Sequence, residues 1–64
     1  MVTVNGKELD VSGKTVSELV EFEKYNPAYI AVELNYNIVP KAQYGETVLK
    51  DGDAVEVVSF VGGG

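Results

Sequence analysis

The sequence contains no cysteine and no histidine. Without cysteine, the chain has no disulfide bond, no thiolate nucleophile and none of the usual zinc-binding patterns. Without histidine, it lacks the side chain that most often acts as a general base near neutral pH. A conventional stand-alone enzyme is hard to build from the remaining residues. Small extracellular domains often depend on disulfides, so the lack of cysteine favours a cytoplasmic protein.

The chain also lacks arginine, and ten acidic residues against five lysines give a net charge of −5. Nucleic acids and anionic membranes require basic surfaces, so neither is expected as a partner. No hydrophobic run has the length of a membrane span, and the first residues show no signal-peptide pattern. The acidity either steers the encounter with a basic protein surface or only maintains solubility.

What the sequence does contain fits one small domain rich in valine. A chain of 64 residues makes a single domain, which buries only about 60% of the surface that the unfolded form exposes. A deep substrate pocket is therefore not expected. The composition is 45% hydrophobic, and the recurrent valines favour strands because branched side chains pack well on a pleated surface.

The first half of the chain predicts two strands and a helix. Two segments of alternating polar and apolar residues flank Asn5-Gly6, and the second continues to residue 11. Asn-Gly favours a tight hairpin because a type I′ turn needs positive φ at both central residues. Thr15 and Glu18 have the spacing of a capping box. They predict a helix over about residues 16–25, which a following Asn-Pro pair ends.

The second half predicts three more strands, with turns between them at Asn35-Tyr36-Asn37 and Asp51-Gly52-Asp53. The strands are expected over residues 29–34, 38–39 and 54–61, with one helical turn over residues 41–44. This order of elements predicts an α+β domain, a mixed sheet of four to five strands with one α-helix packed on one face. The predicted domain covers residues 1–61, and residues 62–64 form a flexible glycine tail.

The alternation also assigns the two faces of the predicted sheet. The side chains expected to form the core are Val2, Val4, Leu9, Val11, Val16, Leu19, Val20, Ile30, Val32, Leu34, Val55 and Val57. With only one helix, the other face of the last strand should be open to solvent. Val58 and Phe60 are then candidate residues for docking a partner protein, unless the strand twists enough to bury Phe60 under residues 41–50. Tyr36 and Tyr44 are either satellite core residues or contact residues.

The chain ends in three glycines, Gly62, Gly63 and Gly64. Because glycine has no Cβ, such a segment can enter a narrow channel in an enzyme and adopt any φ and ψ there. Three extended residues span roughly 10 Å, enough to carry a carboxylate away from a folded domain. The tail therefore suits a reaction on the carboxylate of Gly64, although a flexible terminus without function has the same composition.

Several short motifs follow one another in a characteristic order along essentially the whole chain. They are Asn5-Gly6-Lys7, the Thr-Val-x-Glu-Leu start of the helix, Val32-Glu33-Leu34-Asn35, Ile38-Val39-Pro40-Lys41, Asp51-Gly52-Asp53, and Glu56 to Gly64. Each motif is weak alone, but their order together with the terminal Gly-Gly is fairly specific. In this respect the sequence resembles the ThiS family, the sulfur carriers of thiamine (thiazole) biosynthesis.

The resemblance implies a ubiquitin-like β-grasp fold and a carrier that is not itself an enzyme. It implies that a ThiF-like adenylating enzyme uses ATP and Mg²⁺ on the carboxylate of Gly64, while the carrier binds no cofactor or metal. The acyl-adenylate becomes a thiocarboxylate with sulfur from a donor such as a cysteine desulfurase, and a ThiG-like thiazole synthase accepts that sulfur. Gly62 and Gly63 provide the narrow approach to the enzyme.

Three alternatives share parts of this pattern. The small sulfur-carrying subunit of molybdopterin synthase has the same fold and the same Gly-Gly end, but the segment from Leu34 to Pro40 is more similar to the thiamine carriers. A ubiquitin-like modifier would use the same carboxylate to form isopeptide bonds with lysines. A non-reactive β-grasp interaction module would have an incidental tail.

Overall fold

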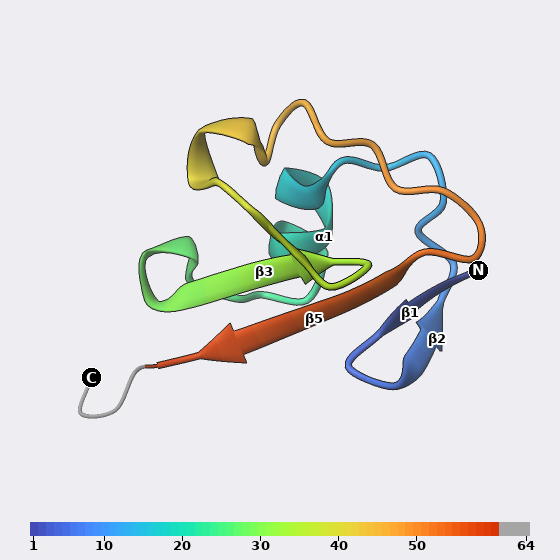
Figure 1. Cartoon of the computed structure of the whole chain (residues 1–64), viewed down its shortest axis with the longest axis horizontal. Helices are drawn as coiled ribbons and strands as arrows, with labels where there is room; N and C mark the ends of the chain where they lie inside the picture. Colours follow the sequence, from blue (N-terminus) through green and yellow to red (C-terminus); the bar gives the residue numbers. More distant parts are fainter. Residues whose placement is uncertain (61–64) are drawn as a thin grey trace.

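The structure, a computed structural model, describes residues 1–60 (Figure 1). In chain order, its elements are β1 (Val2–Val4), β2 (Lys7–Leu9), α1 (Val16–Phe22), a 3-10 turn (Pro27–Tyr29), β3 (Ile30–Leu34), β4 (Asn37–Val39), a second 3-10 turn (Lys41–Gln43) and β5 (Ala54–Ser59). The order of elements is the predicted one, although β2 ends before the expected residue 11. Neither α1 nor the 3-10 turns of residues 1–60 have the length and apolar character of a membrane-spanning helix.

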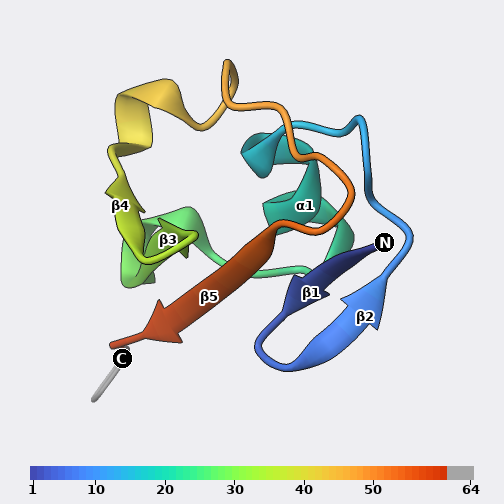
Figure 2. The same ribbon diagram turned by 45° about the vertical axis from the view of Figure 1, so that its right-hand side comes forward.

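The five strands form one mixed sheet in the order β2-β1-β5-β3-β4. Strand β5 lies in the middle, where it is parallel to β1 and antiparallel to β3. Helix α1 lies on one face of the sheet, and the segment between β4 and β5 passes over the same side, as Figures 1 and 2 show. The first and last strands are thus neighbours at the centre, with a helix across one face, and the predicted β-grasp fold is confirmed.

Both hairpins turn through residues with positive φ. Asn5 and Gly6 have φ values of 51° and 83°, which confirms the predicted turn between β1 and β2. Asn35 and Tyr36 have φ values of 51° and 70° between β3 and β4. Each turn therefore begins with an asparagine in the left-handed conformation, which this side chain tolerates better than most.

Helix α1 begins where the capping box was predicted and ends three residues early. The Oγ1 of Thr15 accepts the N–H of Glu18 (3.1 Å), and the carboxylate of Glu18 accepts the N–H of Thr15 (2.9 Å). At the other end, Lys24 has a φ of 61° and donates its N–H to the carbonyl of Glu21, while Tyr25 donates to Val20. These two bonds form a Schellman motif, which ends the helix at Phe22 instead of the predicted residue 25.

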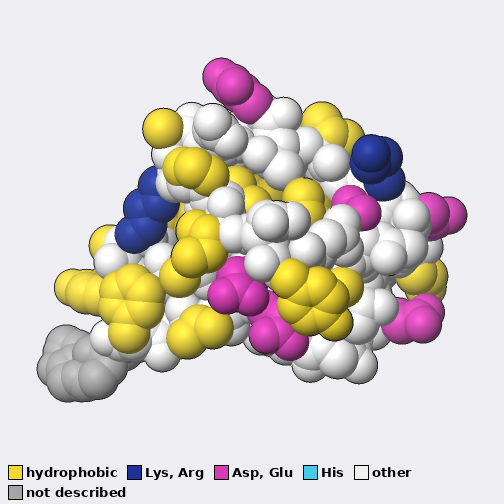
Figure 3. Space-filling view, in the orientation of Figure 1, with side chains coloured by type: hydrophobic (Ala, Val, Ile, Leu, Met, Phe, Trp, Pro, Cys, Tyr) yellow, Lys and Arg dark blue, Asp and Glu magenta, His cyan; other side chains and the backbone are white. Residues whose placement is uncertain are grey.

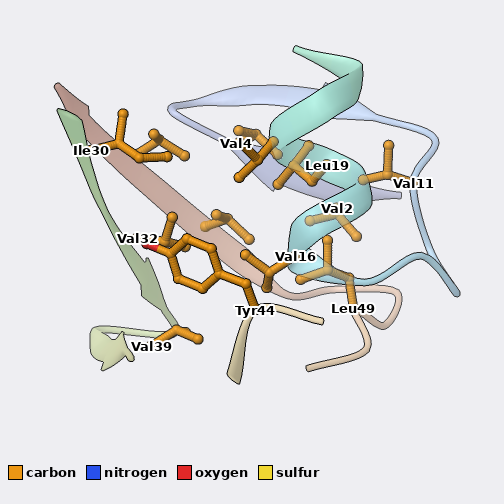
Figure 4. Packing of buried hydrophobic residues seen from close by; sticks show 13 residues of the cluster. Val2, Val4, Val11, Val16, Leu19, Ile30, Val32, Val39, Tyr44 and Leu49 are labelled. Atoms are coloured by element: carbon orange, nitrogen blue, oxygen red, sulfur yellow. The ribbon is translucent and has the colours of Figure 1, made fainter. Parts of the chain in front are cut away.

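The core lies between α1, the crossing segment before β5 and the inner face of the sheet (Figure 4). Ten of the twelve predicted core residues are buried, whereas Leu9 and Leu34 are only partly buried. The core also contains Val39 and Leu49, which were not predicted, and Tyr44, for which a core role and a contact role were both open. Burial raises the pKa of the Tyr44 phenol, and a hydrogen bond with the main chain of Val32 opposes that shift. Tyr44 is therefore a core residue.

Thr15→Ala should lower the free energy of unfolding by about 1 kcal/mol, because it removes the oxygen that caps the first turn of α1. Thr15→Ser keeps an acceptor at the same place and should retain most of that stability. Urea titrations of both variants measure the difference. An unchanged midpoint for Thr15→Ala would show that the capping box contributes nothing to the fold.

Candidate functional site

Strand β5 is the element that leads to the candidate carrier tail. The tail residues Gly62, Gly63 and Gly64 lie outside the described residues. On one side, β5 pairs with β3 as far as Ser59, and the N–H of Phe60 then donates to the carbonyl of the residue before β3 (2.9 Å). The central strand of the sheet is thus held on this side up to the last described residue.

On the other side of β5, the side chain of Asn5 continues the ladder where β1 ends. Strand β1 pairs with β5 only as far as Val55. The Oδ1 of Asn5 accepts the N–H of Val57 (2.8 Å), and its Nδ2 donates to the carbonyl of Val57 (3.3 Å) and to the hydroxyl of Tyr25 (3.3 Å). One amide therefore satisfies both main-chain polar groups of Val57. The sequence indicated Asn5 only as a turn residue.

Asn35 has the same role at the start of β5. Its Oδ1 accepts the N–H of Ala54 (2.9 Å), its own N–H donates to the carbonyl of Ala54 (2.7 Å), and its Nδ2 donates to Asp53 (3.1 Å). Asp53 is buried and also accepts the N–H of Lys50 (2.8 Å). The turn before β5 is thus the structural turn that was predicted, and residues 1–60 contain no cluster of acidic side chains that could hold a metal ion.

Asn5→Gly should lower the free energy of unfolding by about 1–3 kcal/mol, because it keeps the turn but leaves the polar groups of Val57 without their partner. Lys24→Gly is the matched control, since Lys24 also has positive φ and glycine adopts that conformation without strain. It should be neutral or stabilising. Equal losses of stability in the two variants, measured by denaturant titration, would contradict the role of the Asn5 amide.

The face of the sheet opposite α1 carries the apolar residues that were predicted to be exposed. Val58 is 51% exposed and Phe60 is 55% exposed. The alternative in which Phe60 is buried under residues 41–50 is wrong. Tyr36, at the turn between β3 and β4, is 87% exposed and is therefore not a core residue.

Neighbouring strands extend this exposed apolar surface. The strand register places Ala31 opposite Val58, and the hydrogen bond from Phe60 to Tyr29 places these two residues side by side. Ile38 of β4 lies on the same face and is 69% exposed. We call these five residues the outer apolar patch. Four of them lie near the end of β5 that precedes the tail in the sequence, and Ile38 lies opposite Glu33, farther from that end.

Known proteins are similar to this chain in sequence and in fold. A model of the ThiS family matches residues 2–64. The sulfur carrier protein ThiS of Bacillus subtilis is 38% identical over 68 residues, and the match covers 100% of both chains. The crystal structure of the thiamine biosynthesis protein (ThiS) from Geobacter metallireducens has a TM-score of 0.81 and 40% identity, and the match covers 98% of this chain and 97% of that one. The chain belongs to the ThiS family.

A larger relative contains a similar segment. A thiazole synthase of Paramagnetospirillum magneticum is 39% identical over 64 residues, which are 98% of this chain and 20% of that protein. The chain thus spans about a fifth of the length of that relative. The relatives of this chain thus include a protein named as a sulfur carrier and a protein named as a thiazole synthase.

Proposed function

We propose that the chain is a sulfur carrier of thiazole formation in thiamine biosynthesis, and that it carries sulfur on the carboxylate of Gly64. The observation that supports this most strongly is the family match, which extends from residue 2 to residue 64 and so includes all three glycines. The fold agrees with this role, because the central strand precedes the tail in the sequence and Val58 and Phe60 of the outer apolar patch are exposed at its end.

Activation of the carboxylate solves a chemical problem. A carboxylate is a poor acyl donor because hydroxide is a very poor leaving group. With ATP and Mg²⁺, a ThiF-like enzyme joins an oxygen of Gly64 to the α-phosphorus, and pyrophosphate leaves. A persulfide of the donor then attacks the acyl carbon and AMP leaves, which gives an acyl disulfide. A second thiol, on the donor or the enzyme, attacks the sulfur of the donor cysteine, so that a disulfide forms and the thiocarboxylate leaves; with sulfide as the source, attack on the acyl carbon gives the thiocarboxylate directly. The carrier needs no base or thiol of its own, in keeping with a sequence that has neither histidine nor cysteine.

The proposed acceptor of the sulfur is a ThiG-like thiazole synthase. The relative from Paramagnetospirillum magneticum supports this partner, because a protein named thiazole synthase contains a segment similar to this chain. A cysteine desulfurase or a related protein is the proposed sulfur donor, and the cytoplasm is the proposed location. These last two points rest on the sequence alone.

The carboxylate of Gly64 should become a thiocarboxylate, with a mass increase of about 16 Da, when the chain is incubated with a ThiF-like enzyme, Mg-ATP and a sulfur source. Deletion of Gly64, or addition of one alanine after it, should abolish the increase and leave the melting temperature unchanged, since the last residue of a chain in general contributes little to packing. Intact mass measures the product. A lengthened variant that is still fully converted would refute the assignment.

Phe60→Ala should weaken binding to the ThiF-like enzyme by about 2 kcal/mol or more, as expected for an aromatic interface anchor. The melting temperature should change little, because Phe60 is 55% exposed. Phe22→Ala is the matched control: Phe22 is 59% exposed, but it lies on α1 across the sheet from the patch. If Phe60→Ala strongly lowered the melting temperature and left the affinity for the ThiF-like enzyme unchanged, Phe60 would be a core residue and not a docking residue.

A further inference from the structure

Two glutamates face each other on the open side of the sheet. Glu33 of β3 pairs directly with Glu56 of β5 in the antiparallel register. The pair lies on the same face as Val58, because residues two apart on a strand share a face. Directly opposite residues have Cβ atoms about 4.5–5.5 Å apart, so the two glutamate side chains start from adjacent positions on this face. Figure 3 shows acidic and hydrophobic side chains next to each other over β5.

The fold itself gives no reason for this pair. Like charges directly opposite each other destabilise a sheet. Within residues 1–60, neither Glu33 nor Glu56 forms an ion pair or a side-chain hydrogen bond. On β4, the residue opposite Glu33 is Ile38, which is apolar. The repulsion is therefore not compensated by any cation on this part of the chain.

We propose that Glu33 and Glu56 together bind one basic side chain, an arginine in the first place, of the protein that docks on this face. The inference rests on the proposed function, since the docking protein is taken to be the adenylating enzyme. A guanidinium group is planar and offers several N–H donors, so it can bridge two carboxylates and remove their repulsion. The pair then costs stability in the free carrier and contributes attraction in the complex.

The position of the pair also sets the orientation of the partner. Along β5, Glu56 is followed on the same face by Val58 and Phe60, so the acidic pair and Phe60 are roughly 13 Å apart at about 3.3 Å per residue. Val58 and Phe60 lie farther along the chain than Glu56, on the side from which the chain continues into the tail. A partner with a basic group and an apolar depression at this spacing can dock in only one direction, with its active site on the side of the tail.

Charge also decides between the possible occupants of this face. A second copy that stacked through the same face would bring further carboxylates close to Glu33 and Glu56, and each copy carries a net charge of −5. An anionic membrane surface would be repelled in the same way. A protein with a basic group at the interface is the occupant that the charges favour.

The test compares Glu33→Gln, Glu56→Gln and the double variant with Glu21→Gln, which makes the same charge change on α1, on the other side of the sheet. Binding to the ThiF-like enzyme is measured without ATP at several salt concentrations, and melting temperatures are measured on the free chains. The double variant should melt about 1 to 6 °C higher, because it loses the repulsion. Its affinity at low salt should fall about tenfold or more, with a weaker salt dependence. Glu21→Gln should change neither quantity.

Unchanged affinity in the double variant, or an equal loss in Glu21→Gln, would overturn the inference. A lower melting temperature would also overturn it, because the pair would then be part of the fold. Self-association of the wild-type chain, if it became stronger in the double variant, would assign the face to a second copy.

The proposed function is tested separately, by measuring thiocarboxylate formation on the double variant at saturating enzyme. Normal conversion with weakened binding supports both ideas, whereas tight binding of a wild-type chain that is never converted refutes only the function.

Discussion

The position of β5 in the middle of the sheet is the constraint on which the other features depend. A central strand needs hydrogen-bond partners on both sides, since unpaired main-chain groups are costly when they are buried. Strand β1 stops pairing at Val55, and the side chains of Asn5 and Asn35 supply bonds that the neighbouring main chain does not. As a result, the chain that carries Val58 and Phe60 of the outer apolar patch is hydrogen-bonded on both sides, and the tail follows this chain in the sequence.

The small size of the domain explains why one face of this sheet is open. One short helix and the segment before β5 cover the inner face, and the described chain has no second layer for the outer one. Apolar residues such as Val58 and Phe60 are therefore exposed together with the Glu33–Glu56 pair. In an isolated domain this surface is unfavourable. Under the proposed function it has a use, because a partner enzyme would hold the carrier by this face during the reaction on the tail.

Local signals in the sequence were enough to predict much of the fold and the candidate site. The capping box at Thr15 and the exposure of Phe60 follow from residue types and from alternation, and both are confirmed. The end of α1 was missed because Lys24 adopts the conformation that usually indicates glycine. The burial of Leu49 was missed because its segment has no regular pattern of polar and apolar residues. The hydrogen bonds of Asn5 were missed because they depend on the register of strands that are distant in the sequence.

The central claim is that sulfur is carried on the last residue of the chain. The most direct measurement is fragmentation mass spectrometry of the wild-type chain after incubation with a ThiF-like enzyme, Mg-ATP and a sulfur source. The account predicts an increase of about 16 Da that occurs only in fragments containing Gly64. An unmodified Gly64 under conditions in which the enzyme releases pyrophosphate, or sulfur located on any other residue, would contradict it.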